Sequence, residues 1–572
     1  MGFRLLCKGQ TLYKGQTVAL LCARGHAGVF ALCGPSRSMR EVPGTYSDPQ
    51  GLPEKGVWRM RQFSNEPVKD YSIAANRAAM EEALAAVQAQ LGRHYPLIIG
   101  SRRIDTRREI GSVNPSRHEE VVGYVAQAER AEADSAMDAA WNSFGMWSRV
   151  PAEARALSVM KLAAVMRRRR LELVAWLVLE VSKNWREADA DVAEAIDFCE
   201  FYAREAIRYS QMNAVHPHPS EINVQLYIPL GVGVIISPWN FPLAILTGMT
   251  MAAVVTGNTV VIKPANTAGV IAAKFMEMVE EAGIPDGVVN YLPGSGASIG
   301  DYLVQNPRTR FINFTGSKDV GLHINQVAAS GQPGQIWIKR VVAEMGGKNC
   351  IIVDDAADLE SAATGIVASA YGFQGQKCSA CSRAIVVDAA YDEMLERVRA
   401  LTERLSLGPA ADNPDVASVI DEKGYRSIMQ YIEIGSREGR LAAGGRGDAS
   451  LGYNIEPTII ADVDPRARIA QEEVFGPVLA FMRARDFDHA LEMANDTEYG
   501  LTASVCSKSR LHIERAKDRV HVGNLYVNRG CTGALVGLHP FGGFNMSGTD
   551  SKAGGPDYLL LFTQAKSISE TV

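Results

Sequence analysis

The sequence has no uninterrupted apolar run of the roughly 20 residues that a membrane-spanning helix needs, so we expect no membrane insertion. It also lacks an excess of one charge, because 59 Lys and Arg face 64 Asp and Glu, for a net charge of −5. That balance gives no electrostatic reason to bind nucleic acid or an anionic membrane. The nine cysteines lack the spacing of a disulfide framework, which suits a reducing compartment. These absences predict a soluble, cytoplasmic protein.

Metal-ligand spacings are also scarce. Cys378-Ser-Ala-Cys381 has C-x-x-C spacing, but a redox dithiol or half of a zinc site needs companions, and no second C-x-x-C or H-x-x-x-H occurs. A proline separates His216 from His218, and no carboxylate pair accompanies them. This arrangement is more typical of a loop than of metal ligands, so we predict no metal site.

The composition that remains is that of an ordinary globular protein. Hydrophobic residues make up 47% and charged residues 22% of the 572 residues, which is typical of soluble proteins, and the chain is long enough for more than one domain. Residues 1–59 differ from the rest: they hold three cysteines, a near-repeat of Lys-Gly-Gln-Thr and a Pro/Gly-rich tail, and Met60 then opens a stretch that resembles a natural start. We interpret 1–59 as an N-terminal extension without a catalytic part.

Hydrophobic periodicity predicts an α/β fold. Helices are expected over residues 71–92, about 131–145 and 151–210, with a strand-rich piece over 97–125. Strands then alternate with helices that begin near Asn240, Thr267 and Ser298; these strands are expected at 230–237, 258–264, 288–293 and 311–317. Such alternation predicts a parallel, doubly wound sheet. A second α/β block is expected from Ile351, with strands at 383–388, 456–460, 475–481, 502–507 and 524–528. The arginine run 167–170 lies inside a helical pattern and is interpreted as a solvated helix face.

The most informative stretch contains EMGGKN (344–349) and GQKCSA (375–380). Small neighbours leave the sulfur of Cys378 free to face a cleft, and Lys377 is a candidate to lower the pKa of that thiol. A thiolate can attack an aldehyde, the thiohemiacetal can give a hydride to a nicotinamide, and water must then hydrolyse the thioester. Glu344 is the candidate base for that water. Taken alone, Cys378 is better explained as a buried, inert thiol.

Two further motifs lead to a family. SPWNFP (237–242) lies upstream and EEVFGPV (472–478) downstream, and the four motifs in this order resemble the aldehyde dehydrogenase superfamily from about Tyr95 to the C-terminus. The resemblance implies the aldehyde dehydrogenase fold, with a doubly wound NAD-binding domain, an α/β catalytic domain and a small oligomerisation hairpin. It implies Cys378 as nucleophile, Glu344 as general base, and the Asn240 side chain with the Cys378 backbone N–H as oxyanion donors.

A cofactor cleft is expected where the strands of the first sheet end, since a doubly wound sheet binds its ligand at that edge. The turn 293–300 resembles a dinucleotide fingerprint whose last glycine comes one residue late, and the helix after Ser317 can receive a pyrophosphate at its N-terminus. The resemblance implies Lys263 and Glu473 at the two riboses and Phe475 near the nicotinamide. The full set of predicted cofactor residues is Ser237, Trp239, Lys263, Asn266, Gly296, Gly316, Ser317, Glu473 and Phe475.

The choice between NAD and NADP depends on Asn266. NAD-preferring members of the superfamily often have a glutamate three residues after the lysine, where this chain has Asn266. Without that carboxylate, one repulsion against a 2′-phosphate is absent. We expect NAD as the cofactor, with some tolerance of NADP.

Substrate choice is expected to depend on the loop 529–543, whose small residues can offer backbone N–H groups to a carboxylate. With SKNWREADADVAEAIDF (182–198), this loop resembles the bacterial Δ1-pyrroline-5-carboxylate dehydrogenases, which oxidise L-glutamate γ-semialdehyde to glutamate in proline breakdown. The resemblance implies that the amides of Gly533 and Ala534 and the hydroxyl of Ser379 anchor the α-carboxylate. It also places Phe541 on the aliphatic stem, Lys377 nearby as a positive charge and Glu194 near the α-ammonium. For Glu194, a helix-surface carboxylate is an equally good explanation, and a Gly-rich connection without a ligand is the alternative for the loop.

The domain boundaries and partners also follow from the resemblance. We expect an NAD-binding domain from residues 60–210 and 230–343, a catalytic domain from 344–549, and oligomerisation elements from 211–229 and 550–572. A homo-oligomer built from dimers is therefore expected, and a proline dehydrogenase is a plausible partner.

Three rival functions remain open. A CoA-acylating semialdehyde dehydrogenase typically lacks the base that Glu344 provides. A broad-specificity aldehyde dehydrogenase is expected to have an apolar entrance in place of the polar loop 529–543. A non-catalytic descendant of the fold is expected to have lost the nucleophile, which this chain retains as Cys378.

Overall fold

The computed structural model describes residues 6–7, 10–11, 61–211 and 213–572. The chain divides into two units, Met1–Gln62 and Phe63–Val572. In the first unit the described residues form the paired strands β1 (Leu6–Cys7) and β2 (Gln10–Thr11). The interpretation of residues 1–59 therefore falls almost entirely outside the described residues.

The first sheet has seven strands in the order β14-β13-β10-β11-β12-β4-β5. Five of them pair in parallel and the hairpin β4–β5 closes one edge antiparallel. The strands are β4 (Leu97–Ile99), β5 (Arg102–Ile104), β10 (Val232–Ile236), β11 (Thr259–Lys263), β12 (Val289–Tyr291), β13 (Phe311–Thr315) and β14 (Arg340–Glu344). The four strands expected between residues 230 and 317 are confirmed, and β14, which the periodicity did not reveal, adds a fifth.

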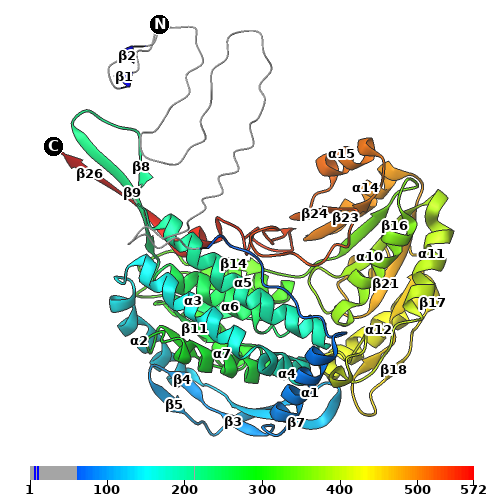
Figure 1. Ribbon diagram of the computed structural model, residues 1–572, viewed down its shortest axis with the longest axis horizontal. Helices are drawn as coiled ribbons and strands as arrows, with labels where there is room; N and C mark the ends of the chain where they lie inside the picture. Colours follow the sequence, from blue (N-terminus) through cyan, green and yellow to red (C-terminus); the bar gives the residue numbers. More distant parts are fainter. Residues whose placement is uncertain (1–5, 8–9, 12–60, 212) are drawn as a thin grey trace, which may run out of the picture. The chain divides into compact units, whose positions relative to one another are not determined.

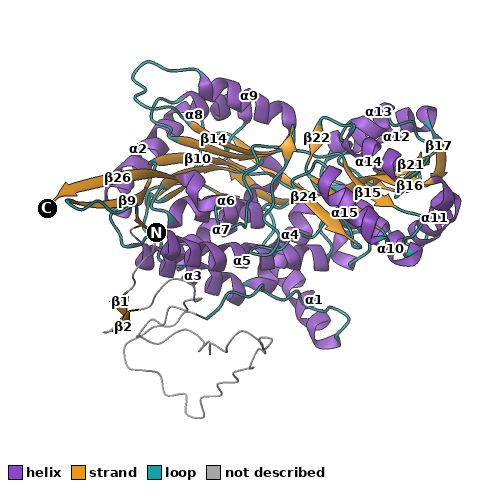
Figure 2. Cartoon of the chain, turned by 90° about the horizontal axis from the view of Figure 1, so that it is seen from above, coloured by secondary structure: helices purple, strands orange, loops and turns teal. Residues whose placement is uncertain are grey.

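Helices cover both faces of this sheet, as a doubly wound arrangement requires. Figure 2 shows α8 and α9 on one side and α6 and α7 on the other. Side chains alternate accordingly, because Val232 and Val234 pack with α2 and α8 whereas Ile235 packs with the cluster that contains α6 and α7. The helices are α2 (Arg130–Trp147), α3 (Ala152–Arg168), α4 (Arg170–Val181), α5 (Trp185–Tyr209), α6 (Ala244–Val255), α7 (Gly269–Glu281), α8 (Asp301–Gln305) and α9 (Lys318–Ala329).

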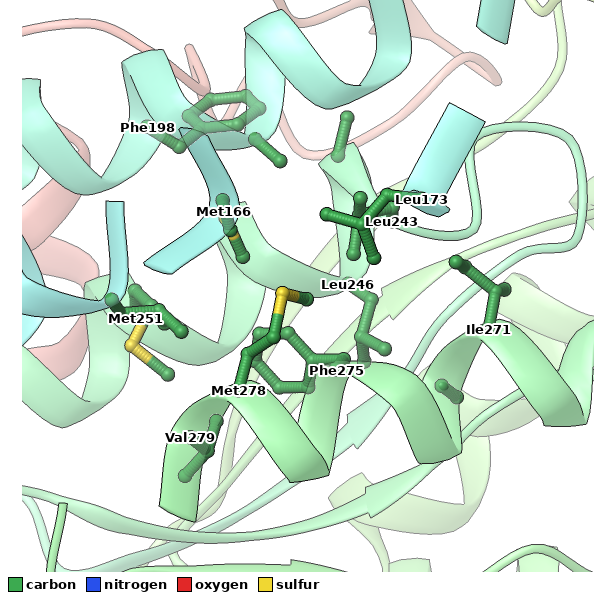
Figure 3. Close-up of a cluster of buried hydrophobic side chains, with 14 of the residues drawn as sticks. Met166, Leu173, Phe198, Leu243, Leu246, Met251, Ile271, Phe275, Met278 and Val279 are labelled. Carbon is green, nitrogen blue, oxygen red and sulfur yellow. The ribbon is translucent and has the colours of Figure 1, made fainter. Parts of the chain in front are cut away.

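The large core beneath the sheet joins α6 and α7 to the earlier helices. Figure 3 shows Leu246 and Met251 of α6 near Phe275 and Met278 of α7, together with Met166 of α3. All five side chains are fully or almost fully buried. This packing fixes the start of α6, and therefore the segment that carries Asn240, against a rigid layer.

The region expected as helix over 151–210 consists of three helices. The chain breaks at Arg169, which has φ −96° and ψ 13°, and again at Ser182, which adopts the left-handed conformation with φ 56°. The interpretation of Arg167–Arg170 as a solvated helix face is wrong for Arg170. That side chain turns inward at the first break, is 7% exposed, and binds Asp189 with Nε 2.6 Å from Oδ1.

The second sheet also has seven strands, in the order β17-β20-β21-β16-β15-β23-β24. It gathers with its helices on one side of the second unit (Figure 1). The strands are β15 (Asn349–Val353), β16 (Cys381–Val387), β17 (Arg440–Ala443), β20 (Thr458–Ala461), β21 (Val478–Ala484), β23 (Thr502–Cys506) and β24 (Asn524–Val527). The helices around it are α10 (Leu359–Tyr371), α11 (Asp388–Thr402), α12 (Glu422–Glu438), α14 (Phe487–Asn495) and α15 (Arg510–Arg519). The second α/β block is thereby confirmed.

Two strand pairs complete the second unit, β18 (Gly447–Asp448) with β19 (Asn454–Ile455) and β22 (Tyr499–Gly500) with β25 (Phe544–Asn545). There are also two three-stranded sheets. One consists of β3 (Arg93–Tyr95), β6 (Glu109–Asn114) and β7 (Arg117–Ala126), beside which lies α1 (Ala74–Gln88). In the other, β26 (Thr563–Thr571) runs antiparallel to β9 (Glu221–Pro229), which also pairs with β8 (Asn213–Ala214). The two segments expected to form the oligomerisation element therefore do pair, although assembly through them stays a prediction. No helix in the described ranges has the length and apolar character to cross a membrane.

Candidate active site

A cavity of about 250 Å³ lies between α5, the end of β14, the segment before β16 and the loop 529–543. Eight residues that the sequence analysis singled out line it: Glu194, Glu344, Lys377, Cys378, Ser379, Gly533, Ala534 and Phe541. They come from four stretches of chain that are far apart in sequence. The fold therefore brings the predicted nucleophile, base and substrate loop to one place.

Cys378 lies at the end of a tight turn that follows α10. Phe373, Gln374 and Gly375 all have left-handed φ values, of 49°, 56° and 66°. A Cβ on Gly375 would lie 2.3 Å from the carbonyl oxygen of Gly476, so this position requires glycine. Non-glycine residues in that conformation are strained and cluster at functional sites. The turn aims the half-buried Cys378 into the cavity.

The surroundings of Cys378 disfavour its thiolate form. Burial, together with the negative charges of Glu344 and Glu473, raises its pKa to about 12. The expectation that Lys377 lowers this pKa is not met, because Nζ of Lys377 is paired with Oε1 of Glu187 at 2.7 Å. The lysine still lines the cavity, but a carboxylate neutralises its charge.

Glu344 is the last residue of β14, where its carboxylate enters the cavity from the edge of the first sheet. Its Oε1 accepts a hydrogen bond from the Ser551 hydroxyl at 2.5 Å, and its Oε2 is buried without a partner in the described structure. Burial raises its pKa to about 8. A carboxylate with a pKa near neutrality and one free oxygen suits a general base. Ser551 was missed by the sequence analysis because no motif marks it.

Asn240 lies in the segment between β10 and α6 and is 5% exposed. Its Nδ2 donates to the carbonyl oxygen of Gln376 at 3.0 Å, two residues before the nucleophile, and the second hydrogen of Nδ2 stays available. The backbone N–H of Cys378 makes no hydrogen bond to any residue that the structure describes. Each of the two segments therefore has one donor without a partner among the described residues.

Asn349 supports the nucleophile from the other side and was also missed. Its Nδ2 donates to the carbonyl oxygens of Cys378 at 2.7 Å and Ala380 at 3.0 Å. A Cβ on Gly347 would lie 2.6 Å from the same Cys378 oxygen. The motif 344–349 thus contacts the segment of the predicted nucleophile as well as containing the predicted base. The presence of this motif before the motif 375–380 was the available sequence signal.

The predicted cofactor edge carries polar atoms that need partners. Ser237 Oγ and Asn266 Oδ1 are buried without a hydrogen bond in the described structure. Lys263 is 8% exposed, forms no ion pair with a described residue, and has its pKa lowered to about 8 by burial. Helix α9 begins after Ser317 without a side-chain cap, so its first amides are free for an anion. This donor set fits a dinucleotide with its ribose hydroxyls and pyrophosphate.

Two glycines at this edge, Gly316 and Gly296, differ in the space that surrounds them. A Cβ on Gly316 would lie 2.5 Å from the Phe314 ring, so the chain there has no space for a side chain. Gly296 begins a single π-helical turn, Gly296–Gly300, that leads into α8, and a Cβ there would meet no atom within 4 Å. The expected helix near Ser298 is therefore confirmed, but its first glycine is not demanded by protein packing.

Glu473, Phe475 and Trp239 meet at the other end of the edge. Oε1 of Glu473 accepts a hydrogen bond from the Gly347 amide at 3.0 Å, and burial raises the pKa of this carboxyl to about 7. A Cβ on Gly346 would lie 2.1 Å from Glu473 Oε2, which explains the glycine. The Phe475 ring packs edge-on against Trp239 with centroids 5.5 Å apart, and Phe475 itself has φ 56°.

The substrate loop lines the cavity as expected. Gly533 has φ +78°, and the Arg529 side chain donates to the carbonyl oxygens of Thr532 and Gly533 at 2.7 and 3.0 Å. The backbone N–H groups of Gly533 and Ala534 donate to no residue that the structure describes. Phe541 is anchored by its own amide, which donates to the carbonyl oxygen of Ala553 at 2.8 Å.

Glu194 is not the surface carboxylate that the alternative interpretation describes. It lines the cavity from α5, and burial, with the charge of Asp191, raises its pKa to about 8. Glu187 lines the same wall. Two carboxyl groups of α5 thus line the same cavity as the loop 529–543, and that of Glu187 is paired with Lys377.

The aldehyde dehydrogenase family model matches residues 103–568, and the chain belongs to the aldehyde dehydrogenase family. Within that family it is 59% identical over 512 residues to the 1-pyrroline-5-carboxylate dehydrogenase of Geobacillus thermodenitrificans, covering 89% of this chain and 99% of the relative.

Solved structures give the same result. The 1-pyrroline-5-carboxylate dehydrogenase from Thermus with bound NAD superposes with a TM-score of 0.89 at 54% identity, over 90% of this chain and 100% of that one. Proline utilization A from Bdellovibrio bacteriovorus superposes with a TM-score of 0.88 at 45% identity, over 89% of this chain and 53% of that one. The predicted fold, a doubly wound sheet joined to a second α/β block, is confirmed by this likeness.

Proposed function

We propose that the protein oxidises L-glutamate γ-semialdehyde, formed by hydration of Δ1-pyrroline-5-carboxylate, to L-glutamate with NAD. The observation that carries this proposal is the shared cavity, in which Cys378 and Glu344 face a loop of free N–H groups at 533–534. The first pair suits aldehyde oxidation, and the loop suits a carboxylate at the other end of a short substrate. The relatives at 59% and 54% identity are both named 1-pyrroline-5-carboxylate dehydrogenase.

The reaction proceeds in two stages on Cys378. The thiolate adds to the aldehyde carbon, and the side chain of Asn240 and the amide of Cys378 donate to the oxygen that becomes negative. A bound NAD would supply the hydride acceptor for the carbon bonded to sulfur, and its cationic ring would favour the thiolate. The resulting thioester is attacked by a water whose proton passes to Glu344. Collapse of this second adduct breaks the C–S bond and releases glutamate and the Cys378 thiolate that began the cycle.

The unpartnered groups of the cofactor edge would hold NAD. Lys263 would bind the adenosine ribose, Glu473 the nicotinamide ribose, and the amides after Ser317 the pyrophosphate. At Asn266 a neutral amide stands where a carboxylate would repel a 2′-phosphate, so NADP is expected to be tolerated.

Asn240→Ala tests the oxyanion role. One oxyanion donor contributes about 3–4 kcal/mol to the transition state, so turnover should fall on the order of 10²–10³-fold with little change in KM. Steady-state kinetics of NAD reduction measures this. A variant with nearly full turnover would remove Asn240 from the role.

Ser379→Ala tests the carboxylate anchor. Loss of a hydrogen bond to a charged group costs about 1.5–3 kcal/mol, so the KM for the semialdehyde should rise about 10- to 100-fold. The KM for propanal, which has no carboxylate, should stay the same in the same variant. An equal rise for both aldehydes would contradict the anchoring role.

Assembly and pathway are proposed on the same basis. Pairing of β26 with β9 builds a strand ribbon that suits dimer formation, and we propose a homo-oligomer built from such dimers in the cytoplasm. The Bdellovibrio neighbour is named for proline utilization and is about twice as long as the region matched. We propose a proline dehydrogenase as the source of the substrate.

Purified protein should reduce NAD with L-pyrroline-5-carboxylate far faster than with propanal or with methylmalonate semialdehyde plus CoA. Absorbance of NADH follows each reaction. Activity on simple aldehydes alone would keep the chemistry but discard the substrate. A requirement for CoA would favour acyl transfer, and the absence of any activity would favour a non-catalytic role.

A further inference from the structure

A buried ion pair connects the two segments that hold the oxyanion donor and the nucleophile. Lys183 and Asp191 both have no exposed surface, and Nζ of Lys183 lies 2.9 Å from Oδ2 of Asp191. Neither residue lines the cavity. Buried charges are costly to desolvate and are often retained for a reason other than stability, so this pair needs an explanation.

Asp191 holds the segment that carries Asn240. Its Oδ1 accepts the backbone N–H of Ala244 at 2.7 Å, which is the first residue of α6, four positions after Asn240. The residue at the N-cap of that helix, Leu243, provides no side-chain cap. A carboxylate from α5 therefore takes the place of a local cap and fixes the start of α6.

Lys183 holds both segments through aromatic rings. Its Nζ lies 3.7 Å from the centroid of Phe241, next to Asn240, and 4.6 Å from that of Phe373, in the turn before Cys378. The two rings lie edge to face with centroids 6.3 Å apart. An ammonium desolvated between aromatic faces is attracted to both.

The turn that contains Phe373 needs such support. Phe373 and Gln374 adopt left-handed conformations, with φ of 49° and 56°, that persist only when the surroundings hold them. Beside Lys183, the carbonyl of Ser182 accepts a hydrogen bond from Gln374 Nε2 at 3.0 Å. Two consecutive residues at the junction between α4 and α5, Ser182 and Lys183, therefore contact this turn.

We infer that Lys183, held by Asp191, is a positioning residue that sets the Asn240 amide relative to the Cys378 sulfur. The inference rests on the proposed function, because it acts through the oxyanion donor. A misplacement of about 1 Å in a reacting geometry can cost on the order of 100-fold in rate. Loss of the ammonium should therefore lower turnover, with little effect on the binding of NAD or aldehyde.

The test uses Lys183→Met and the charge-neutral pair Lys183→Met/Asp191→Asn. The single variant leaves an uncompensated buried carboxylate and is expected to lose stability. The pair variant leaves no buried charge at either position. Asp191→Asn keeps a side-chain oxygen, which can still accept the hydrogen bond from the Ala244 N–H. For the folded pair variant we expect kcat to fall at least about tenfold and KM to change less than about threefold.

Lys274→Met is the matched control. Lys274 is also buried, pairs with Glu277 at 2.8 Å, and lies 5.3 and 5.0 Å from the ring centroids of Tyr95 and Trp176. It contacts neither segment of the active site. Its variant should lose stability, as judged by thermal unfolding, but keep kcat within about twofold.

A double-mutant cycle separates positioning from a structural role. If Lys183 acts through Asn240, the pair variant should cost less than about twofold in kcat once Asn240→Ala is present. An unchanged kcat in the folded pair variant would overturn the inference. So would a loss in kcat of the same size whether or not Asn240→Ala is present. In both cases an active wild-type protein would leave the proposed function standing. An inactive wild-type protein would overturn both.

Discussion

Cys378→Ala should lower NAD reduction with L-pyrroline-5-carboxylate by about 10⁴-fold or more, because its sulfur is the atom proposed to form the covalent adduct. The thiol follows a strained turn and is half-buried at the cavity wall. Removal of its sulfur deletes the bond-forming atom and leaves this frame in place. Stopped-flow and steady-state assays of NADH formation measure the loss, and calorimetry should show NAD binding within about threefold of wild type.

Cys381→Ala is the control for a general effect of thiol removal. Cys381 lies three residues on, at the start of β16, and is buried with its sulfur toward the carbonyl of Arg383. Its variant should keep activity within a few-fold and lose only packing energy, about 1 kcal/mol. If Cys381→Ala abolished turnover and Cys378→Ala did not, the nucleophile would have been assigned to the wrong cysteine.

The sequence predicted those features that depend on local patterns or on motifs. Strands β10, β11, β12 and β13 lie within the expected ranges, because short apolar runs bounded by turn residues are local signals. The motifs at 344–349 and 375–380 pointed to the stretches that the fold brings together. These are the parts of the site where chemistry restricts which residue types can serve.

Other features depend on tertiary partners and leave no local signal. The burial of Arg170 needs Asp189 on another helix, and a helical pattern alone cannot distinguish that from a solvated face. The contact of Ser551 with Glu344 spans 207 positions, and Lys183 is identified only by the rings that surround it. The sequence led us to expect that Lys377 lowers the pKa of Cys378, whereas that pKa is raised. The cause is again a distant partner, since Lys377 is paired with a carboxylate 190 positions away.

Glu344→Gln should separate the two stages of the reaction. Glutamine keeps the size and the oxygen that accepts from Ser551, but it cannot take a proton from water. Hydride transfer precedes that step, so one equivalent of NADH per active site should form in a burst, after which turnover should fall on the order of 10³-fold. Rapid-mixing absorbance shows the burst, and mass spectrometry of the quenched enzyme should show the thioester on Cys378.

The pH dependence gives this prediction a second readout. Burial raises the pKa of Glu344 to about 8, so the carboxylate that acts as base forms as the pH rises through 8, and thioester hydrolysis in the wild type should rise with it. In Glu344→Gln this rise of thioester hydrolysis with pH should vanish.

Glu180→Gln is the matched control, because Glu180 is also fully buried with its pKa raised to about 7 but accepts from the Val270 and Ile271 amides at the start of α7. It should lose stability and show no burst. A burst-free Glu344→Gln with normal turnover would assign the base elsewhere.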